Sequence, residues 1–264
     1  MGSDTPGRSH RTPIKHFVLN MTLGRVIGAL TSGSFDIPAR LPIRVVDLCA
    51  GDGRAPEGET SSPEIIHKHI NFPGLRGKAS ATFFEIAANN YDSLRGIWGG
   101  QHNIEIIHGN ANAFRLAGDP MQAAFIHIDP NSLGSWPVTP DMARSFGKAT
   151  TFLATLGCNV GGLKQLGFDT HRREWYDHIR CLADLPAWHD LQLYVLNRDA
   201  AQWAYLLRIP TAWAEQTSRV IMRHGSARWP AGLGFASMKK TPDTFHEMLD
   251  GLFMTKKERK NGTR

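Results

Sequence analysis

The sequence predicts one α/β domain with a mostly parallel sheet of six or seven strands and helices on both faces. Three short apolar runs each lead to an acidic residue, at Asp47, Glu85 and Asp129. Segments with helical periodicity separate these runs, and a Gly-x-Gly turn follows the first run. Buried strands that alternate with helices are typical of a Rossmann-like sheet, in which ligands bind at the carboxyl ends of the strands. The three acidic residues are therefore expected at one edge of the sheet.

The length and composition fit a single globular domain. The chain has 264 residues, of which 41% are hydrophobic and 20% charged, which allows a sizeable core and argues against disorder through most of the chain. It contains no apolar run of transmembrane length and no apolar signal core in its polar first residues. The three cysteines, Cys49, Cys158 and Cys181, are scattered without metal-ligand spacing. We therefore expect a cytoplasmic protein with reduced thiols, no membrane contact and no bound metal.

The net charge of +6 comes from the two ends of the chain. Residues 1–16 carry +2 and residues 254–264 carry +4, so residues 17–253 are formally neutral. Residues 1–12 are expected to form a disordered arm, and a single domain is expected over 13–253. The basic tail 254–264 could hold a nucleic-acid backbone electrostatically or could be a solvated end, and the composition leaves both interpretations open.

The first element expected is an amphipathic helix from Pro13 to about Gly33, with apolar residues at helical spacing. This helix precedes the first strand and is expected to cover one face of the sheet. Lys15 and His16 at its start are expected on the surface rather than in a site.

The first strand, Val45–Leu48, leads into a turn with glycines at positions 51 and 53. Glycines lack the Cβ atoms that would collide with a closely bound ligand, and Asp47 at the strand end can fix the loop or accept a hydrogen bond from the ligand. These features fit an adenosyl cofactor that lies across the strand ends. The dinucleotide fingerprint G-x-G-x-x-G is not met, because position 56 is proline and no helix begins at once. A glycine-rich turn after any buried strand is the alternative interpretation.

A capping box and a second acidic strand end follow along the chain. Ser61 and Glu64 form the box that opens the next helix. The strand Ala81–Glu85 ends in a carboxylate that, in an adenosyl-binding site, would accept hydrogen bonds from both ribose hydroxyls. Alternatively, this carboxylate caps the helix expected over 87–97.

The third strand is expected over 103–107, and a turn with Asn110 and Ala111 follows it. Asn110 supplies an acceptor oxygen that could receive a hydrogen bond from the amino group of adenine. His108 beside it is a lone histidine, for which a structural role is the expectation.

The fourth strand, Ala123–Ile128, ends in Asp129-Pro130, and the proline restricts Asp129 to an extended conformation. Amino-methyltransferases of DNA and RNA carry a (D/N/S)-P-P-(Y/F/W) tetrapeptide at this place, which holds the target amino group and stacks on the flipped base. In this chain Asn131 replaces the second proline, and Trp136 is the nearest candidate for stacking. This departure weakens the argument for base methylation.

The rest of the chain shows weaker patterns. We expect a helix over 141–146, a strand over 151–156, a glycine loop over 157–164, a helix over 171–185, an antiparallel edge pair of strands over 191–196 and 203–209, helical character over 212–219, a loop over 229–234 and a short helix over 245–253. We find no internal repeat and no second domain.

The strand and glycine turn around Asp47 resemble the first motif of class I S-adenosylmethionine (SAM) methyltransferases. Together with Lys15-His16, Glu57-Gly58 and Ser62-Pro63, the motif is similar to the three-Cys-motif partner family of predicted SAM-dependent methyltransferases, over roughly residues 13–210. The resemblance implies a class I methyltransferase fold, SAM as cofactor and a partner protein with a three-Cys motif. That family shows Asp-Pro-aromatic-Gly after the fourth strand, from which this sequence departs.

The sequence therefore predicts a SAM-dependent methyltransferase that acts on an amino group of a nucleic-acid base, in DNA or RNA. The residues expected to bind the cofactor are Asp47, Cys49, Ala50, Gly51, Gly53, Glu85, Ile86, Asn110, Ala111 and Asp129. The residues expected at the methyl acceptor are Asp129, Pro130, Asn131 and Trp136. The alternatives are a methyltransferase of a small molecule or protein, and a non-catalytic partner subunit that keeps the fold for docking.

Overall fold

The computed structural model describes residues 12–33, 38–55, 59–114, 122–130, 142, 149–158, 189–198, 201–210, 213 and 234–239. Several predicted features lie outside these residues: the N-terminal arm, the glycine loop from 159 onward, the helices over 141–146 and 212–219 apart from Met142 and Trp213, the helices over 171–185 and 245–253, and the basic tail.

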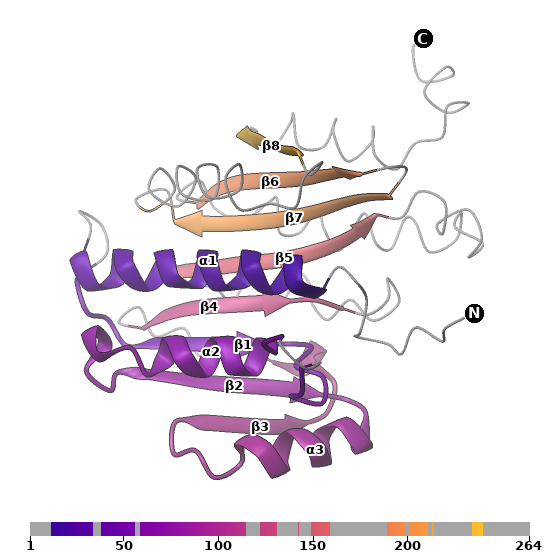
Figure 1. The fold of residues 1–264 in the computed structure, drawn as a ribbon. Helices are drawn as coiled ribbons and strands as arrows, with labels where there is room; N and C mark the ends of the chain where they lie inside the picture. Colours follow the sequence, from indigo (N-terminus) through magenta and orange to yellow (C-terminus); the bar gives the residue numbers. More distant parts are fainter. Residues whose placement is uncertain are drawn as a thin grey trace, which may run out of the picture.

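The described elements alternate between helix and strand in the first half of the chain (Figure 1). The helices are α1 (Thr12–Ser32), α2 (Ser62–Ile70) and α3 (Ala88–Trp98), with short 3₁₀ turns η1 (Pro73–Leu75) and η2 (Ala111–Ala113). The strands are β1 (Ile43–Asp47), β2 (Ala79–Glu85), β3 (Ile104–His108), β4 (Ala123–Ile128), β5 (Thr150–Cys158), β6 (His189–Arg198), β7 (Ala201–Pro210) and β8 (Gly234–Lys239).

All of these strands belong to one sheet with the order β3-β2-β1-β4-β5-β7-β6-β8. The first five pair in parallel, β7 pairs antiparallel with both β5 and β6, and β8 pairs antiparallel with β6. Because β1 and β4 are neighbours but are far apart in sequence, the sheet is wound outward in both directions from β1. The predicted Rossmann-like, mostly parallel sheet is confirmed, and the carboxyl ends of β1 to β5 lie at one edge.

The predicted strand number was wrong at the far side of the sheet. The sequence was expected to form at most seven strands, with a loop over 229–234 and with β6 and β7 as an edge pair, whereas Gly234 begins an eighth strand. This short segment, Gly-Phe-Ala-Ser-Met-Lys, lacks a β-branched run, so its own propensity for strand is weak. Its pairing with β6 along the full segment supplies the backbone hydrogen bonds that propensity alone did not predict.

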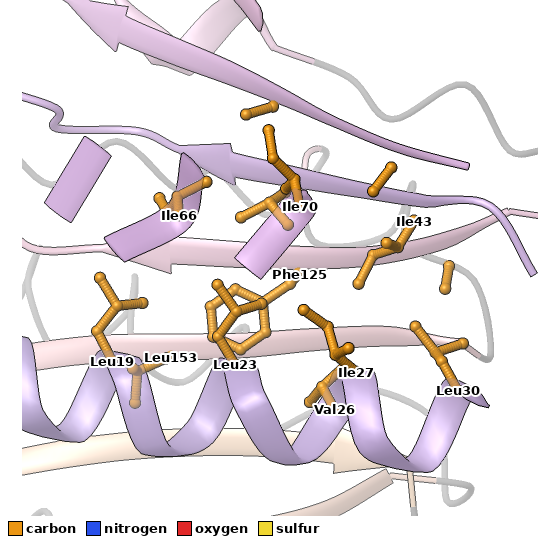
Figure 2. Packing of buried hydrophobic residues seen from close by; sticks show 14 of the residues in the cluster. Leu19, Leu23, Val26, Ile27, Leu30, Ile43, Ile66, Ile70, Phe125 and Leu153 are labelled. Carbon is orange, nitrogen blue, oxygen red and sulfur yellow. The ribbon is translucent and has the colours of Figure 1, made fainter. Parts of the chain in front are cut away.

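Helix α1 packs lengthwise on the sheet, as the helical spacing predicted. Its fully buried side chains include Leu19, Leu23 and Leu30, and Figure 2 shows Leu23 beside Phe125 of β4 and Leu19 near Leu153 of β5. Burial of each such side chain contributes about 1.5–3 kcal/mol. This packing fixes α1 so that its first turn lies toward the carboxyl ends of the central strands (Figure 1).

Helix α2 begins where the capping box predicted. Ser61 has extended backbone angles and its side-chain oxygen accepts a hydrogen bond from the backbone N–H of Glu64, while Pro63 occupies the first turn. The apolar residues of α2, together with Leu94 of α3, join the same buried cluster as α1. In the described part of the chain these three helices therefore cover one face of the sheet. None of the described helices has the length and apolar character needed to cross a bilayer.

Candidate functional site

The loop after β1 is tied to the strands on both sides of it. The backbone N–H of Leu48 donates to the carbonyl oxygen of His127 in β4 at 3.0 Å, and that of Ala50 donates to Phe84 in β2 at 3.0 Å. Parallel pairing also places Asp47 opposite His127. The ends of β1, β2 and β4 therefore converge around this loop, as their acidic residues predicted.

The two glycines of the loop have different structural roles. Both have left-handed backbone angles, with φ of +68° at Gly51 and +74° at Gly53, which other residues adopt only with strain. A Cβ atom at Gly51 would meet none of the described residues within 4 Å, so in this part of the chain open space adjoins the loop there. A Cβ atom at Gly53 would lie 2.8 Å from Cδ1 of Leu94 in α3. Packing against α3 therefore accounts for the glycine at position 53, and contact of both glycines with a cofactor stays a prediction.

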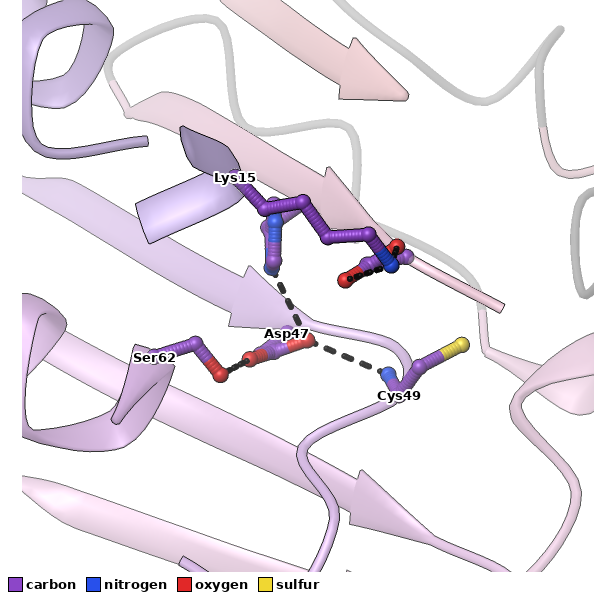
Figure 3. A network of polar contacts seen from close by, with 6 residues as sticks. Lys15, Asp47, Cys49 and Ser62 are labelled. Atoms are coloured by element: carbon purple, nitrogen blue, oxygen red, sulfur yellow. Dashed lines mark hydrogen bonds and ion pairs between the residues drawn. The ribbon is translucent and has the colours of Figure 1, made fainter. Parts of the chain in front are cut away.

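Asp47 is completely buried and joins three parts of the fold (Figure 3). Its carboxylate accepts hydrogen bonds from the backbone N–H of Cys49 at 3.1 Å and from Oγ of Ser62 at 2.7 Å. Nδ1 of His127 lies 3.1 Å from Oδ1 in an ion pair. Of the two roles predicted for Asp47, the structure favours fixing the loop, because the side chain presents no surface to a ligand.

The buried pair of Asp47 and His127 shifts the pKa of both groups. Burial alone would raise the pKa of Asp47, but His127 and the hydrogen bonds from Ser62 and Cys49 hold it below the ordinary value of 3.8. Burial alone would lower the pKa of His127, but the neighbouring carboxylate, Asp47 foremost, raises it above 6.5. Each group thus stabilises the charged form of the other.

A second ion pair, between Lys15 and Asp129, lies beside the first pair (Figure 3). Nζ of Lys15 donates to both carboxylate oxygens of Asp129, at 2.8 and 3.0 Å, and the two side chains are only 15% and 19% exposed. His16 is partly buried, and this burial together with the nearby His127 lowers its pKa to about 4. The expectation that Lys15 and His16 lie on the surface was wrong.

The sequence does hold a signal that would have placed Lys15 in the site. Lys15 precedes the buried residues Val18 and Leu19 by three and four positions, so it continues the apolar stripe of α1. A basic residue on the buried stripe at the end of a helix needs a partner. That partner lies 114 residues away in sequence, which is why the pattern of α1 alone could not identify it.

The end of β2 presents one anchored carboxylate and one exposed apolar side chain. Oε1 of Glu85 accepts a hydrogen bond from the backbone N–H of Ala87, just before α3, at 2.7 Å. The contact expected of a capping residue is thus present, and ribose binding stays a prediction for this carboxylate. Ile86 is 67% exposed, so its apolar side chain is open to contact with a flat ligand surface.

Asn110 and Ala111 follow β3 at the same edge of the sheet. Asn110 is exposed, and its side-chain oxygen accepts a hydrogen bond from the backbone N–H of Asn112 at 2.9 Å. Ala111 is buried. The sequence pattern did not predict a neighbouring aromatic pair, in which the ring of His108 stacks on Tyr91 with centroids 4.7 Å apart. A His–aromatic pair 17 positions apart on successive elements gives no local pattern that would reveal it.

The remaining predicted residues divide into two groups. Cys49 belongs to the loop, and burial followed by the charges of Asp47 and Asp129 raises the pKa of its thiol well above the ordinary value, which disfavours a thiolate nucleophile. Asn131 and Trp136 lie outside the described residues. Among the residues that are described, no group of three or more His, Cys, Asp or Glu side chains is arranged to hold a metal ion.

Comparison with solved structures shows a related fold. A protein of Legionella pneumophila from the family DUF519 has a TM-score of 0.51 at 11% identity, over 85% of this chain and 96% of that chain. The N-methyltransferase NodS from Bradyrhizobium japonicum in complex with S-adenosyl-L-homocysteine has a TM-score of 0.42 at 12% identity, over 76% and 89%. A precorrin-6y C5,15-methyltransferase from Geobacter metallireducens has a TM-score of 0.40 at 10% identity, over 80% and 94%.

The architecture is a Rossmann-like, mostly parallel sheet, with the reversed strand β7 inserted between β5 and β6. At 11% identity the likeness to the Legionella protein shows the fold alone. No family model matches the sequence, and the comparison with curated proteins gives no match.

Proposed function

We propose that this chain is a SAM-dependent methyltransferase. The observation that carries the proposal is the loop at Gly51, where the described residues leave open space beside a left-handed backbone between the ends of β1, β2 and β4. Glu85 and Asp129 place carboxylates at the ends of the two neighbouring strands. An adenosyl cofactor has hydroxyl and amino groups that can donate hydrogen bonds to such carboxylates, and its adenosyl part lacks the phosphates that a helix N-terminus would bind.

In this proposal the loop from Cys49 to Gly53 holds the amino-acid part of SAM, and Glu85 holds the ribose. Ile86 supplies an apolar contact for the adenine ring and Asn110 a hydrogen bond at its edge. Asp47 acts indirectly, because its buried carboxylate fixes the loop through Cys49. SAM supplies an electrophilic methyl group, and the protein aligns the acceptor with it by positioning.

The acceptor in our proposal is an amino group of a nucleic-acid base. Asp129 lies at the end of β4, and the following proline directs its carboxylate and backbone, as an amino-group acceptor requires. The basic tail 254–264 supports a polyanionic partner. A protein with a three-Cys motif is proposed as partner on the resemblance described above.

Two features support a second candidate, a methyltransferase of a small molecule or protein. Residues 17–253 are formally neutral, and Ser132 stands where nucleic-acid amino-methyltransferases carry the stacking aromatic. The third hypothesis is a non-catalytic subunit that keeps the fold, and failure of the protein to bind SAM would favour it.

The proposal is tested by titration calorimetry with SAM and with its product S-adenosylhomocysteine (SAH). We expect micromolar binding of both ligands, lost in Glu85→Ala and retained in Glu105→Ala, which removes an exposed carboxylate of β3 that pairs with Arg44. Absence of binding to the wild-type protein by calorimetry and by thermal shift would refute the methyltransferase assignment.

If SAM binds, transfer of radiolabelled methyl to DNA, RNA, protein and small amines identifies the acceptor. Salt-sensitive binding to nucleic acid that weakens on deletion of 254–264 would support the base-modifying function. Methyl transfer only to a small molecule or protein would support the second candidate instead.

A further inference from the structure

The ion pair between Lys15 and Asp129 lies where the methyl acceptor would bind in the proposed function. Nζ of Lys15 donates to Oδ1 at 2.8 Å and to Oδ2 at 3.0 Å, so one ammonium group engages both oxygens of the carboxylate. The same oxygens would have to accept the hydrogen bonds of an incoming amino group. Each carboxylate oxygen can accept more than one hydrogen bond, but the ammonium group already occupies one acceptor site on both, so an acceptor amine competes with Lys15 for this carboxylate.

We propose that Lys15 is a specificity-determining residue of the acceptor position. Its ammonium group stands in for the amino group of the acceptor and is displaced when the acceptor binds. The inference rests on the proposed function and deepens it, because it states which chemical groups the position admits. A group that donates N–H bonds can replace the ammonium, whereas a carboxylate or a carbon acceptor would leave Asp129 without a donor.

The surroundings of the pair allow this exchange without movement of the helix. Val18 and Leu19, in the next turn of α1, are buried in the core and hold the backbone of the helix in place. Lysine has a flexible four-carbon stem, so its head group can turn away while the backbone stays fixed. Exchange of one charge-assisted hydrogen bond for another also makes the net change in free energy small.

Two histidines, His127 and His16, interact electrostatically with Asp129. His127 of β4 interacts electrostatically with Asp129, and the buried Asp47 raises the pKa of His127 above its ordinary value. His16 from α1 also faces this carboxylate, but burial and the neighbouring His127 favour its neutral form. His127 therefore stays beside Asp129 when Lys15 turns away, and its charged form is favoured over that of His16.

A pair of cofactor analogues tests the inference without a known acceptor. SAH is neutral at its sulfur, whereas sinefungin carries a protonated amine where SAM carries the sulfonium methyl group, beside the acceptor position. Calorimetry gives the ratio of the two dissociation constants in each variant. Lys15→Met removes the resident ammonium and exposes Asp129 to the amine, so we expect sinefungin to gain about tenfold over SAH, as removal of one charge near an ion predicts.

The controls separate this role from a structural one. Lys15→Arg keeps a cation on Asp129, and Lys68→Met removes an exposed lysine of α2, so both are expected to leave the ratio within about twofold of wild type. Asp129→Asn is expected to change the ratio in the opposite direction, against sinefungin. This variant also tests the inference if Lys15→Met does not fold.

The possible results are distinguishable. If both ligands weaken together in Lys15→Met and the ratio stays at the wild-type value, Lys15 only anchors α1 and the inference is overturned. If the wild-type protein binds neither analogue, the proposed function fails, and the inference fails with it.

Discussion

The buried ion pair of Asp47 and His127 should contribute strongly to the stability of the fold. In Asp47→Asn the amide keeps the shape of the side chain and can still accept from Cys49, but it carries no charge to pair with His127. Removal of one member of a fully buried pair costs about 3–5 kcal/mol. Since the amide retains part of the hydrogen bonding, we expect a loss near the lower end, about 3 kcal/mol, which corresponds to a fall in Tm of roughly 8 °C.

The pH dependence of this loss identifies its origin. The pKa of Asp47 is lowered, so its contribution is present above the ordinary value of 3.8 and is lost as the pH falls below it. The pKa of His127 is raised, so its contribution is complete below 6.5 and is lost as the pH rises through the raised value. The difference between wild type and Asp47→Asn should therefore be largest between about pH 4 and 6.5 and should shrink in alkaline buffer.

Urea unfolding followed by circular dichroism from pH 5 to pH 9 measures this difference. The matched control is Glu105→Gln, which removes the ion-pair partner of Arg44. Because the glutamate side chain is 57% exposed, we expect this control to lose at most about 1 kcal/mol of stability. If Asp47→Asn costs no more than this control, or if its cost does not vary with pH, the reasoning from burial and mutual pKa shifts is refuted.

Three further predictions concern the loop, the edge of β2 and the core. Gly51→Ala should lower Tm by only a few degrees, because strain at positive φ costs about 1–2 kcal/mol, but it should greatly weaken SAM binding in calorimetry. Gly53→Ala should lower Tm further, because its Cβ atom collides with α3. Equal effects of the two variants on stability would contradict the distinction between the two glycines. Ile86→Ser should leave urea unfolding unchanged, since the side chain is exposed, and should reduce SAM affinity several-fold. Unaltered affinity would show that Ile86 does not contact the cofactor. Thr151→Val should raise stability in urea by up to about 1 kcal/mol, because the threonine hydroxyl is buried and has no hydrogen-bond partner among the described residues; a loss above 1 kcal/mol would show that the hydroxyl is satisfied.

Local chemistry in the sequence was sufficient to predict the central part of the fold. The apolar runs that end at Asp47, Glu85 and Ile128 all form parallel strands, and their carboxyl ends meet at one edge as expected. The capping box at Ser61 starts α2 because its hydroxyl satisfies a backbone N–H three residues away. Each of these predictions depends on residues a few positions apart, so the sequence by itself contains the information needed.

Only the tertiary structure decided which of these residues meet and what each one does. Lys15 reaches Asp129 across 114 positions, because core packing of α1 places its first turn at the end of β4. Packing against α3 requires a glycine at position 53, and Asp47 is buried against His127 and Ser62. Strand β8 forms because β6 offers it an unpaired edge. A local pattern determines whether a segment forms a helix or a strand. The contacts of its side chains depend on how distant elements pack, because that packing minimises the free energy of the whole domain rather than of any one segment.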